Sequence, residues 1–202
     1  LYAQRSQESL TPQGVFDSGP GYAWVRQGGD RLSKYVLDDV LVATGQMGGL
    51  YAEPRLATLH DWMYRGSCTP WRTNLTFGDS DPSRPIEALL GYVQPYRVHL
   101  FAPSAARNAA WLVRDVEPRP LLSLYALLDA SLLSPEPPTS ALWQDTACLR
   151  EPGGSEEALL GALWSPHTSG SHAHHDVNAV HLCAYGENVL RNSGYCGSEV
   201  GV

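Results

Sequence analysis

The chain has 202 residues, of which 43% are hydrophobic and 17% are charged, and its formal net charge is −7. This balance is typical of a globular protein and argues against a disordered chain. The negative charge argues against a nucleic-acid partner, but a few clustered arginines could still bind an anionic polysaccharide. The longest apolar run, residues 121–133, is too short to span a bilayer.

The first two thirds of the chain have helical periodicity. Apolar residues recur at three- and four-residue spacing. One such segment ends at Gly66, a second begins after the capping candidate Ser104, and a third begins after Pro120. Trp62, Met63 and Trp111 fall on the apolar faces of these helices and are predicted core residues, as is Trp164 in the strand region. We predict helices over 31–44, 53–65, 83–93, 105–114 and 120–133.

The last third of the chain is predicted to contain strands. A proline-rich stretch cannot continue a helix, so we place a linker at 135–140, between a helical region, 1–134, and a strand region, 141–202. Short apolar segments separated by Gly, Pro and Ser follow the linker, and they are typical of antiparallel strands. We predict strands over 141–149, 158–164, 177–185 and 188–190.

The four cysteines show no CxxC spacing and are too sparse for a disulfide scaffold. We expect most of them to be buried thiols, although Cys183 and Cys196 could lie close together in a hairpin. The chain begins at Leu1 without a basic and then apolar leader, so no signal peptide is visible and we expect a fragment.

Polar side chains of catalytic type gather near the C-terminal end. Three of the seven histidines fall within four positions, next to a carboxylate and a carboxamide. If this segment is extended, alternation places four of these side chains on one face, where two imidazoles can serve one metal ion or one substrate. The four are His172, His174, Asp176 and Asn178. The remaining histidines, His60, His99, His167 and His181, are expected to be structural.

This block resembles the heparinase II/III family of polysaccharide lyases. The family has a His-x-His-x-Asp run, a strand, and then a Gly-Glu and a Ser-Gly-Tyr turn, which match Gly186-Glu187 and Ser193-Gly194-Tyr195 here. The resemblance extends upstream to the strand ending in Leu149-Arg150 and to Phe77-Gly78-Asp79-Ser80, although that last segment could be only a capped turn. It implies an α+β multidomain fold, with part of an (α/α) toroid followed by the start of an antiparallel β-sandwich, both truncated.

The resemblance also implies β-elimination at a uronic acid of an anionic polysaccharide. Such a site must neutralise the sugar carboxylate, remove the neighbouring proton and protonate the leaving oxygen. The matching histidine is His172. Tyr22, in a Gly-Pro-Gly-Tyr loop, is the candidate tyrosine, and Arg26 could lower its pKa from the free value of ~10. Arg26 and Asn178 are candidate substrate contacts, and the carboxylate-neutralising Asn or His would precede residue 1.

The family also binds a structural zinc ion. The resemblance implies His174 as the first ligand, but Asn192 stands where the family has an aspartate, and the later histidine would follow Val202. A neutral carboxamide is a poor zinc ligand, so we expect a weakened site that His175 or Asp176 could partly compensate.

Three functions remain open from the sequence. The first is a polysaccharide lyase acting on alginate, a glycosaminoglycan or another uronate glycan, in the periplasm or cell envelope as the resemblance implies. The second is a noncatalytic or degenerate glycan-binding member of the family, which the departure at Asn192 favours. The third is a metal-assisted hydrolase built on the histidine cluster, which would need another strong ligand.

Overall fold

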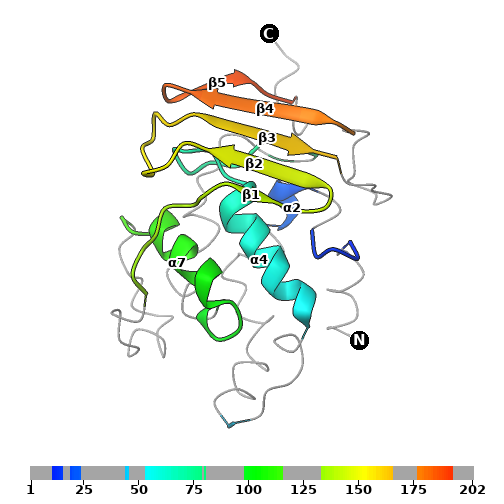
Figure 1. Ribbon diagram of the computed structural model, residues 1–202, viewed down its shortest axis with the longest axis vertical. Helices are drawn as coiled ribbons and strands as arrows, with labels where there is room; N and C mark the ends of the chain where they lie inside the picture. The colour runs from blue at the N-terminus through cyan, green and yellow to red at the C-terminus, as the bar shows by residue number, and fades with distance from the viewer. Residues whose placement is uncertain are drawn as a thin grey trace.

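The computed structural model describes residues 11–15, 19–23, 44–45, 53–78, 80, 98–115, 133–165 and 177–192. Figure 1 shows the strands of this part lying side by side as one sheet, with two of the helices below them. The labelled elements are α2 (Pro20–Ala23), α4 (Pro54–Gly66), α7 (Pro103–Leu112), β1 (Ala141–Leu142), β2 (Thr146–Arg150), β3 (Leu160–Trp164), β4 (Ala179–Ala184) and β5 (Glu187–Leu190).

The five strands form one antiparallel sheet in the order β1-β2-β3-β4-β5. The predicted strands are confirmed with shifted ends, and the strand predicted over 141–149 is two strands separated by a turn. In the register, Cys148 lies opposite Ala162, which lies opposite His181. Because residues directly opposite each other on neighbouring antiparallel strands point to the same face, these three side chains lie on the same side of the sheet.

The helix predicted over 53–65 is α4. Glu53 caps its first turn by accepting a hydrogen bond from the Arg55 backbone N–H at 3.2 Å, and Pro54 occupies the first helical position. The helix ends at Gly66, where a Cβ atom would lie 2.6 Å from the ring of Trp143. The end of α4 thus packs directly against the turn between β1 and β2.

The helix predicted over 105–114 is α7, but it begins two residues earlier. Its N-cap is Ala102, which makes no side-chain capping bond, so the prediction that Ser104 caps this helix is wrong. Pro103 explains the difference, because proline has a helical φ and lacks the N–H that a cap would satisfy. The helices predicted over 31–44, 83–93 and 120–133 lie outside the described residues, apart from their terminal residues 44 and 133.

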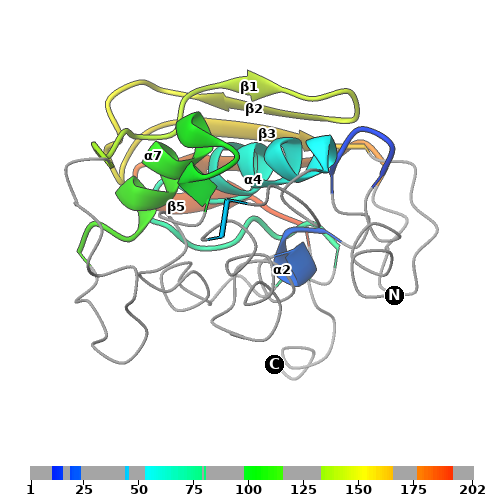
Figure 2. The same ribbon diagram turned by 90° about the horizontal axis from the view of Figure 1, so that it is seen from below.

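The helices and one face of the sheet share a single core. Figure 2 shows α4 and α7 side by side below β1 and β2. Trp62 and Met63 of α4, Trp111 of α7 and Trp164 of β3 are all buried, as predicted, and the rings of Trp62 and Trp164 lie 5.5 Å apart. The proposed division at the linker 135–140 stays a prediction, although residues 133–140 are not helical.

Arg150 joins the sheet to the end of α4. Its Nε donates to the carbonyl of Arg65 at 2.9 Å, and its Nη2 donates to the carbonyl of Cys68 and lies 3.3 Å from the Cys68 sulfur. The first of these bonds satisfies a carbonyl group that the last turn of α4 leaves without an intrahelical partner, and the second reaches the segment that follows the helix. The Leu-Arg strand end that carried part of the resemblance therefore fastens the two layers together.

Cys68, Cys148 and Cys183 are free buried thiols, as expected, and Cys196 lies outside the described residues. Burial raises the pKa of all three thiols, that of Cys183 to about 12. They are therefore protonated at neutral pH and unsuited to nucleophilic chemistry. In the same part of the chain, each helix is too short or too polar to cross a lipid bilayer.

Candidate active site

The described residues include only part of the segments that carry the predicted catalytic groups. Tyr22 lies within the one-turn helix α2 rather than in the predicted loop, because Pro20 has a helical φ and starts the turn. The side chain of Tyr22 lies outside the described residues. Arg26, His172 and His174 also lie outside the described residues, as do His175 and Asp176. The described part of the candidate site consists of α2, the turn that α2 contacts and the two ends of the β3–β4 connection.

The helix α2 is docked on the turn formed by Phe77, Gly78 and Ser80. The Gly21 N–H donates to the Ser80 Oγ at 2.8 Å, and the same hydroxyl donates to the Phe77 carbonyl at 2.5 Å. Gly19 has a φ of 88°, and a Cβ atom there would lie 2.6 Å from the Phe77 carbonyl oxygen. Glycine is required at this contact by its φ and by the close approach of the backbone.

The same turn contacts the sheet. The Phe77 ring stacks on Trp164, with centroids 5.6 Å apart and planes inclined by 10°, and it meets the ring of His181 edge-on at 6.1 Å. Ser80 is fully buried, so its hydroxyl is a structural contact rather than a glycan contact. Phe77 therefore lies between α2, which carries Tyr22, and the last residue of β3.

The β3–β4 connection, residues 165–178, carries the predicted histidines, and its two ends are held together. Trp164 pairs with Ala179 across the strands, and the Ser165 hydroxyl donates to the Asn178 Oδ1 at 3.1 Å. Asn178 lies in a turn with a φ of 63°. The prediction that strand alternation extends to Asn178 is wrong, because this left-handed conformation interrupts an extended chain.

His181 is structural, as predicted. Its Nδ1 accepts from the Thr76 hydroxyl at 3.2 Å, and its Nε2 donates to the Asn188 Oδ1 at 2.7 Å. Both ring nitrogens thus have partners in one neutral tautomer, assigned from these partners. Burial lowers the pKa of His181, the Asn188 bond raises it to a smaller extent, and Arg191 lowers it. His60 is also buried and lies 2.8 Å from the Tyr64 hydroxyl through its Nδ1.

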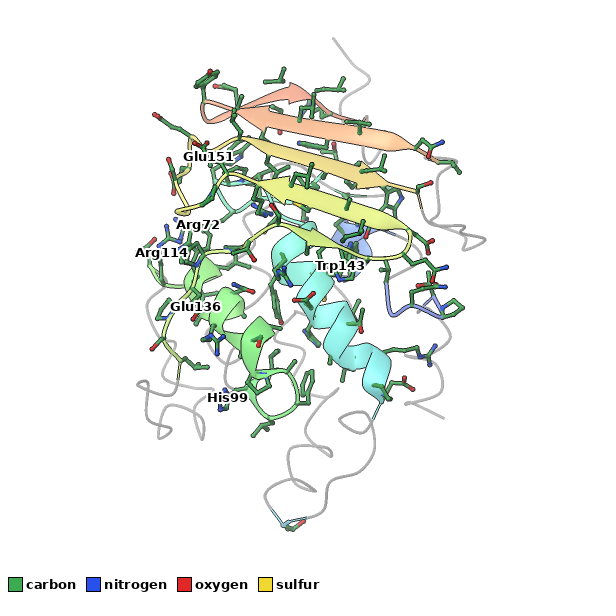
Figure 3. All side chains as sticks on the ribbon, viewed as in Figure 1. Arg72, His99, Arg114, Glu136, Trp143 and Glu151 are labelled. Atoms are coloured by element: carbon green, nitrogen blue, oxygen red, sulfur yellow. The ribbon has the colours of Figure 1, made fainter. Side chains whose placement is uncertain are left out.

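Several arginines of the described residues are engaged in ion pairs. Figure 3 shows Arg72 and Arg114 close together near the end of α7. Arg72 pairs with Asp115 at 2.8 Å and with Glu156 at 3.3 Å, and Arg114 lies 4.1 Å from the centroid of the Trp111 ring. Because these guanidinium groups already have partners, they are poor candidates for binding sulfate or carboxylate groups.

The metal ligands proposed from the sequence are not brought together within the described residues. Asn192 follows β5 and is half-buried, whereas His174 lies outside the description. Within the described ranges, no three His, Cys, Asp or Glu side chains are grouped closely enough to hold a metal ion. One imidazole and one carboxamide do not fit the four-ligand shell that structural zinc requires.

Heparinases and a heparan sulfate lyase are among the solved structures that share this fold. No protein-family profile and no curated protein matches the sequence. A crystal structure of heparinase III aligns with 96% of this chain at 12% identity and a TM-score of 0.64. Heparan sulfate lyase HepC from Pedobacter heparinus covers 98% of the chain at 14% identity and a TM-score of 0.58. Another heparinase III, with methylated lysines, covers 97% at 15% identity and a TM-score of 0.56.

The resemblance indicated by the sequence motifs is thus confirmed at the level of the fold. The chain spans about 30% of the length of these solved structures. Its α+β composition and its antiparallel sheet agree with the predicted fold class, whereas the toroid and the sandwich stay predictions.

Proposed function

We propose that this chain is part of a polysaccharide lyase of the heparinase II/III family that cleaves a uronate-containing glycan by β-elimination. The observation that carries the proposal is the position of Phe77. Its turn holds α2, which carries Tyr22, and its ring stacks on Trp164, one residue before the connection that carries His172. The helix that carries Tyr22 and the strand end from which the His172 connection starts therefore contact the same turn. The fold of the solved heparinases supports the same function.

The proposed chemistry divides the elimination between two side chains. The tyrosine hydroxyl of Tyr22, ionised, removes the weakly acidic proton beside the sugar carboxylate. The electrons of that C–H bond form the new carbon–carbon double bond while the bond to the glycosidic oxygen breaks. Protonated His172, on the other side of the sugar, donates its proton to the leaving oxygen, so the step ends with Tyr22 protonated and His172 neutral. Arg26, four residues after Tyr22, would favour the tyrosinate by its positive charge.

A sulfated glycosaminoglycan is the first candidate substrate and alginate is the second. Two of the solved structures are named heparinase III and one is named a heparan sulfate lyase, which favours heparan-type chains as the anionic substrate. Asn178, exposed at the base of the β3–β4 connection, is a candidate contact to the sugar. Action on such polymers is consistent with the periplasm or cell envelope.

Zinc is a subordinate part of the proposal. His174 and Asn192 alone do not fit a zinc site, so no step of the reaction is assigned to the metal. If the complete polypeptide binds zinc, Asn192→Asp is expected to tighten that binding, because the change adds an anionic oxygen. Adding a chelator is then expected to lower the melting temperature of the aspartate variant by more than that of the wild type.

The test uses the complete polypeptide that contains these residues, incubated with heparan sulfate and with alginate. The expected product absorbs in the near ultraviolet because elimination creates an unsaturated uronate. Tyr22→Phe and His172→Ala are each expected to lower the rate by ~10²–10⁴-fold. Tyr185→Phe is the matched control, because Tyr185 is exposed in the β4–β5 turn.

Other results of this experiment would favour one of the alternative functions or would change the assigned residues. Binding of either glycan without any ultraviolet product would support the noncatalytic member of the family. Cleavage without the new absorbance, abolished by a chelator, would support a metal-assisted hydrolase. Full activity of Tyr22→Phe would remove Tyr22 from the proposal.

A further inference from the structure

The hydroxyl of Ser80 occupies an unusual place for a serine in a turn. It is fully buried, accepts a hydrogen bond from the Gly21 N–H at 2.8 Å and donates one to the Phe77 carbonyl at 2.5 Å. Gly21 lies in the first turn of α2, where backbone N–H groups have no intrahelical acceptor. Ser80 therefore does for α2 what an N-cap side chain normally does, but from 59 positions away in the sequence.

The helix α2 depends on such external contacts. It has four residues, PGYA, and a helix of one turn is unstable by itself because its nucleation costs more than its few hydrogen bonds return. Its placement is set by the Gly21–Ser80 bond and by the close approach of Gly19 to the Phe77 carbonyl. The backbone of Tyr22, the residue after Gly21, is held through the same two contacts.

We propose that Ser80 is a positioning residue that fixes the orientation of α2 and thereby of Tyr22 for proton abstraction. The inference rests on the proposed function, in which Tyr22 is the base. Loss of the Ser80 hydroxyl leaves the Gly21 N–H without its buried acceptor and frees the one-turn helix to shift. A misplacement of about 1 Å can cost on the order of 10²-fold in rate, because proton transfer depends steeply on the approach of the reacting atoms.

The variant that tests this role is Ser80→Ala in the complete polypeptide, assayed by the ultraviolet absorbance of the product. We expect kcat to fall by about 10–100-fold with KM changed by less than about threefold. The pH profile of kcat is expected to shift on the limb that reports ionisation of Tyr22, because the proposed function relies on the charge of Arg26 to favour the tyrosinate and a shifted helix changes that interaction. A merely structural serine would change neither the profile nor the ratio of kcat to KM in folded protein.

Ser67→Ala is the matched control. Ser67 is also fully buried, and its hydroxyl donates to the Met63 carbonyl at 2.5 Å, but it lies at the end of α4. Both variants lose a buried serine hydroxyl, so both should lower the melting temperature by a similar amount, and assays are run where both remain folded. Only Ser80→Ala should lose turnover.

Gly19→Ala reaches α2 from the other side of the same contact. The added methyl group meets the Phe77 carbonyl, so this variant should reproduce the fall in kcat and the shifted pH profile even if Ser80→Ala does not fold. If Tyr22→Phe is inactive but Ser80→Ala or Gly19→Ala behaves like Ser67→Ala, the positioning role is overturned and the proposed function stands. If Tyr22→Phe is fully active, the proposed base is wrong, and the positioning role falls with it.

Discussion

The two faces of the sheet differ in packing much more than in composition. The inner face carries Trp164, Cys148 and His181, which are almost completely buried against α4 and the Phe77 turn. The outer face carries Leu149 and Val189, which are 68% and 64% exposed, together with Leu163, Val180 and Leu182. Apolar side chains thus occupy both faces, whereas an antiparallel sheet with one solvated face usually alternates apolar and polar residues.

The comparison teaches that hydrophobicity alone does not measure what a residue contributes to this fold. The outer face is hollowed around Gly161, where a shallow depression of about 500 Å³ is lined by Leu149, Leu159, Leu182 and Val189. On the inner face the same kind of side chain fills a close-packed core. Substitutions of equal size should therefore have unequal effects on the two faces.

The largest expected effect is that of Trp164→Ala. Its ring contacts both Trp62 and Phe77, so truncation should lower the free energy of unfolding by about 3–5 kcal/mol. Leu163→Ala, one position earlier and on the outer face, should cost less than about 1 kcal/mol. Urea unfolding of both variants measures the difference, and equal losses would show that the two faces are equally packed.

Arg150→Met tests the link between the inner face and α4. The change removes the bonds to the carbonyls of Arg65 and Cys68, and leaving buried acceptors unpaired should cost about 1–3 kcal/mol. The exposed Arg191 provides the control, since Arg191→Met should change stability by less than about 0.5 kcal/mol. Similar urea midpoints for the two variants would contradict the fastening role of Arg150.

The pH dependence of stability should report His181. Because its pKa in the folded protein is lowered from the ordinary value of 6.5, the unfolded chain binds the proton more readily. The stability contributed by neutral His181 is present above pH 6.5 and is lost as the pH falls from there toward the folded pKa. Melting curves between pH 5 and 8 should therefore show a melting temperature that falls more steeply with decreasing pH for the wild type than for His181→Phe. Equal slopes for the two proteins would argue that His181 is not the source of the pH dependence.

The smallest expected effect is that of Gly161→Ala on the outer face. A Cβ atom there would meet only the Leu182 side chain, at an ordinary 3.5 Å, so the change should be neutral or stabilising by up to about 1 kcal/mol. Gly66→Ala is the contrasting variant, because its Cβ would collide with the Trp143 ring and should destabilise by about 1–3 kcal/mol. A lower melting temperature for Gly161→Ala than for Gly66→Ala would contradict the conclusion that the outer face is the more loosely packed one.

Local patterns predicted the elements that local forces determine. The apolar spacing over 53–65 became α4, and the alternating segments after residue 141 became strands, since helix and strand periodicities are properties of neighbouring residues. The errors also have local causes. Pro103 rather than Ser104 begins α7, and the strand predicted over 141–149 is interrupted by a turn at residues 143–145.

In the candidate site, too, the sequence predicted local features and missed contacts between distant segments. The sequence identified Tyr22, His172 and the Phe77–Ser80 segment by their motifs, because each motif is contiguous. It did not reveal that the Ser80 hydroxyl binds the backbone of α2, nor that Thr76 binds His181 across 105 positions. The serine was visible in the Phe77-Gly78-Asp79-Ser80 motif, but nothing in that motif names its partner.

The sequence by itself determined the α+β character of the chain, its helix-then-strand order and the chemistry of its candidate residues. Only the tertiary structure decided which face of the sheet is buried, because both faces carry apolar side chains and the alternation of residues along the strands does not indicate which face packs against the helices. It also decided that α2 and β3 meet at Phe77. The physical reason is that helix and strand signals act over a few residues, whereas burial and long-range hydrogen bonds depend on which segments the folded chain brings together.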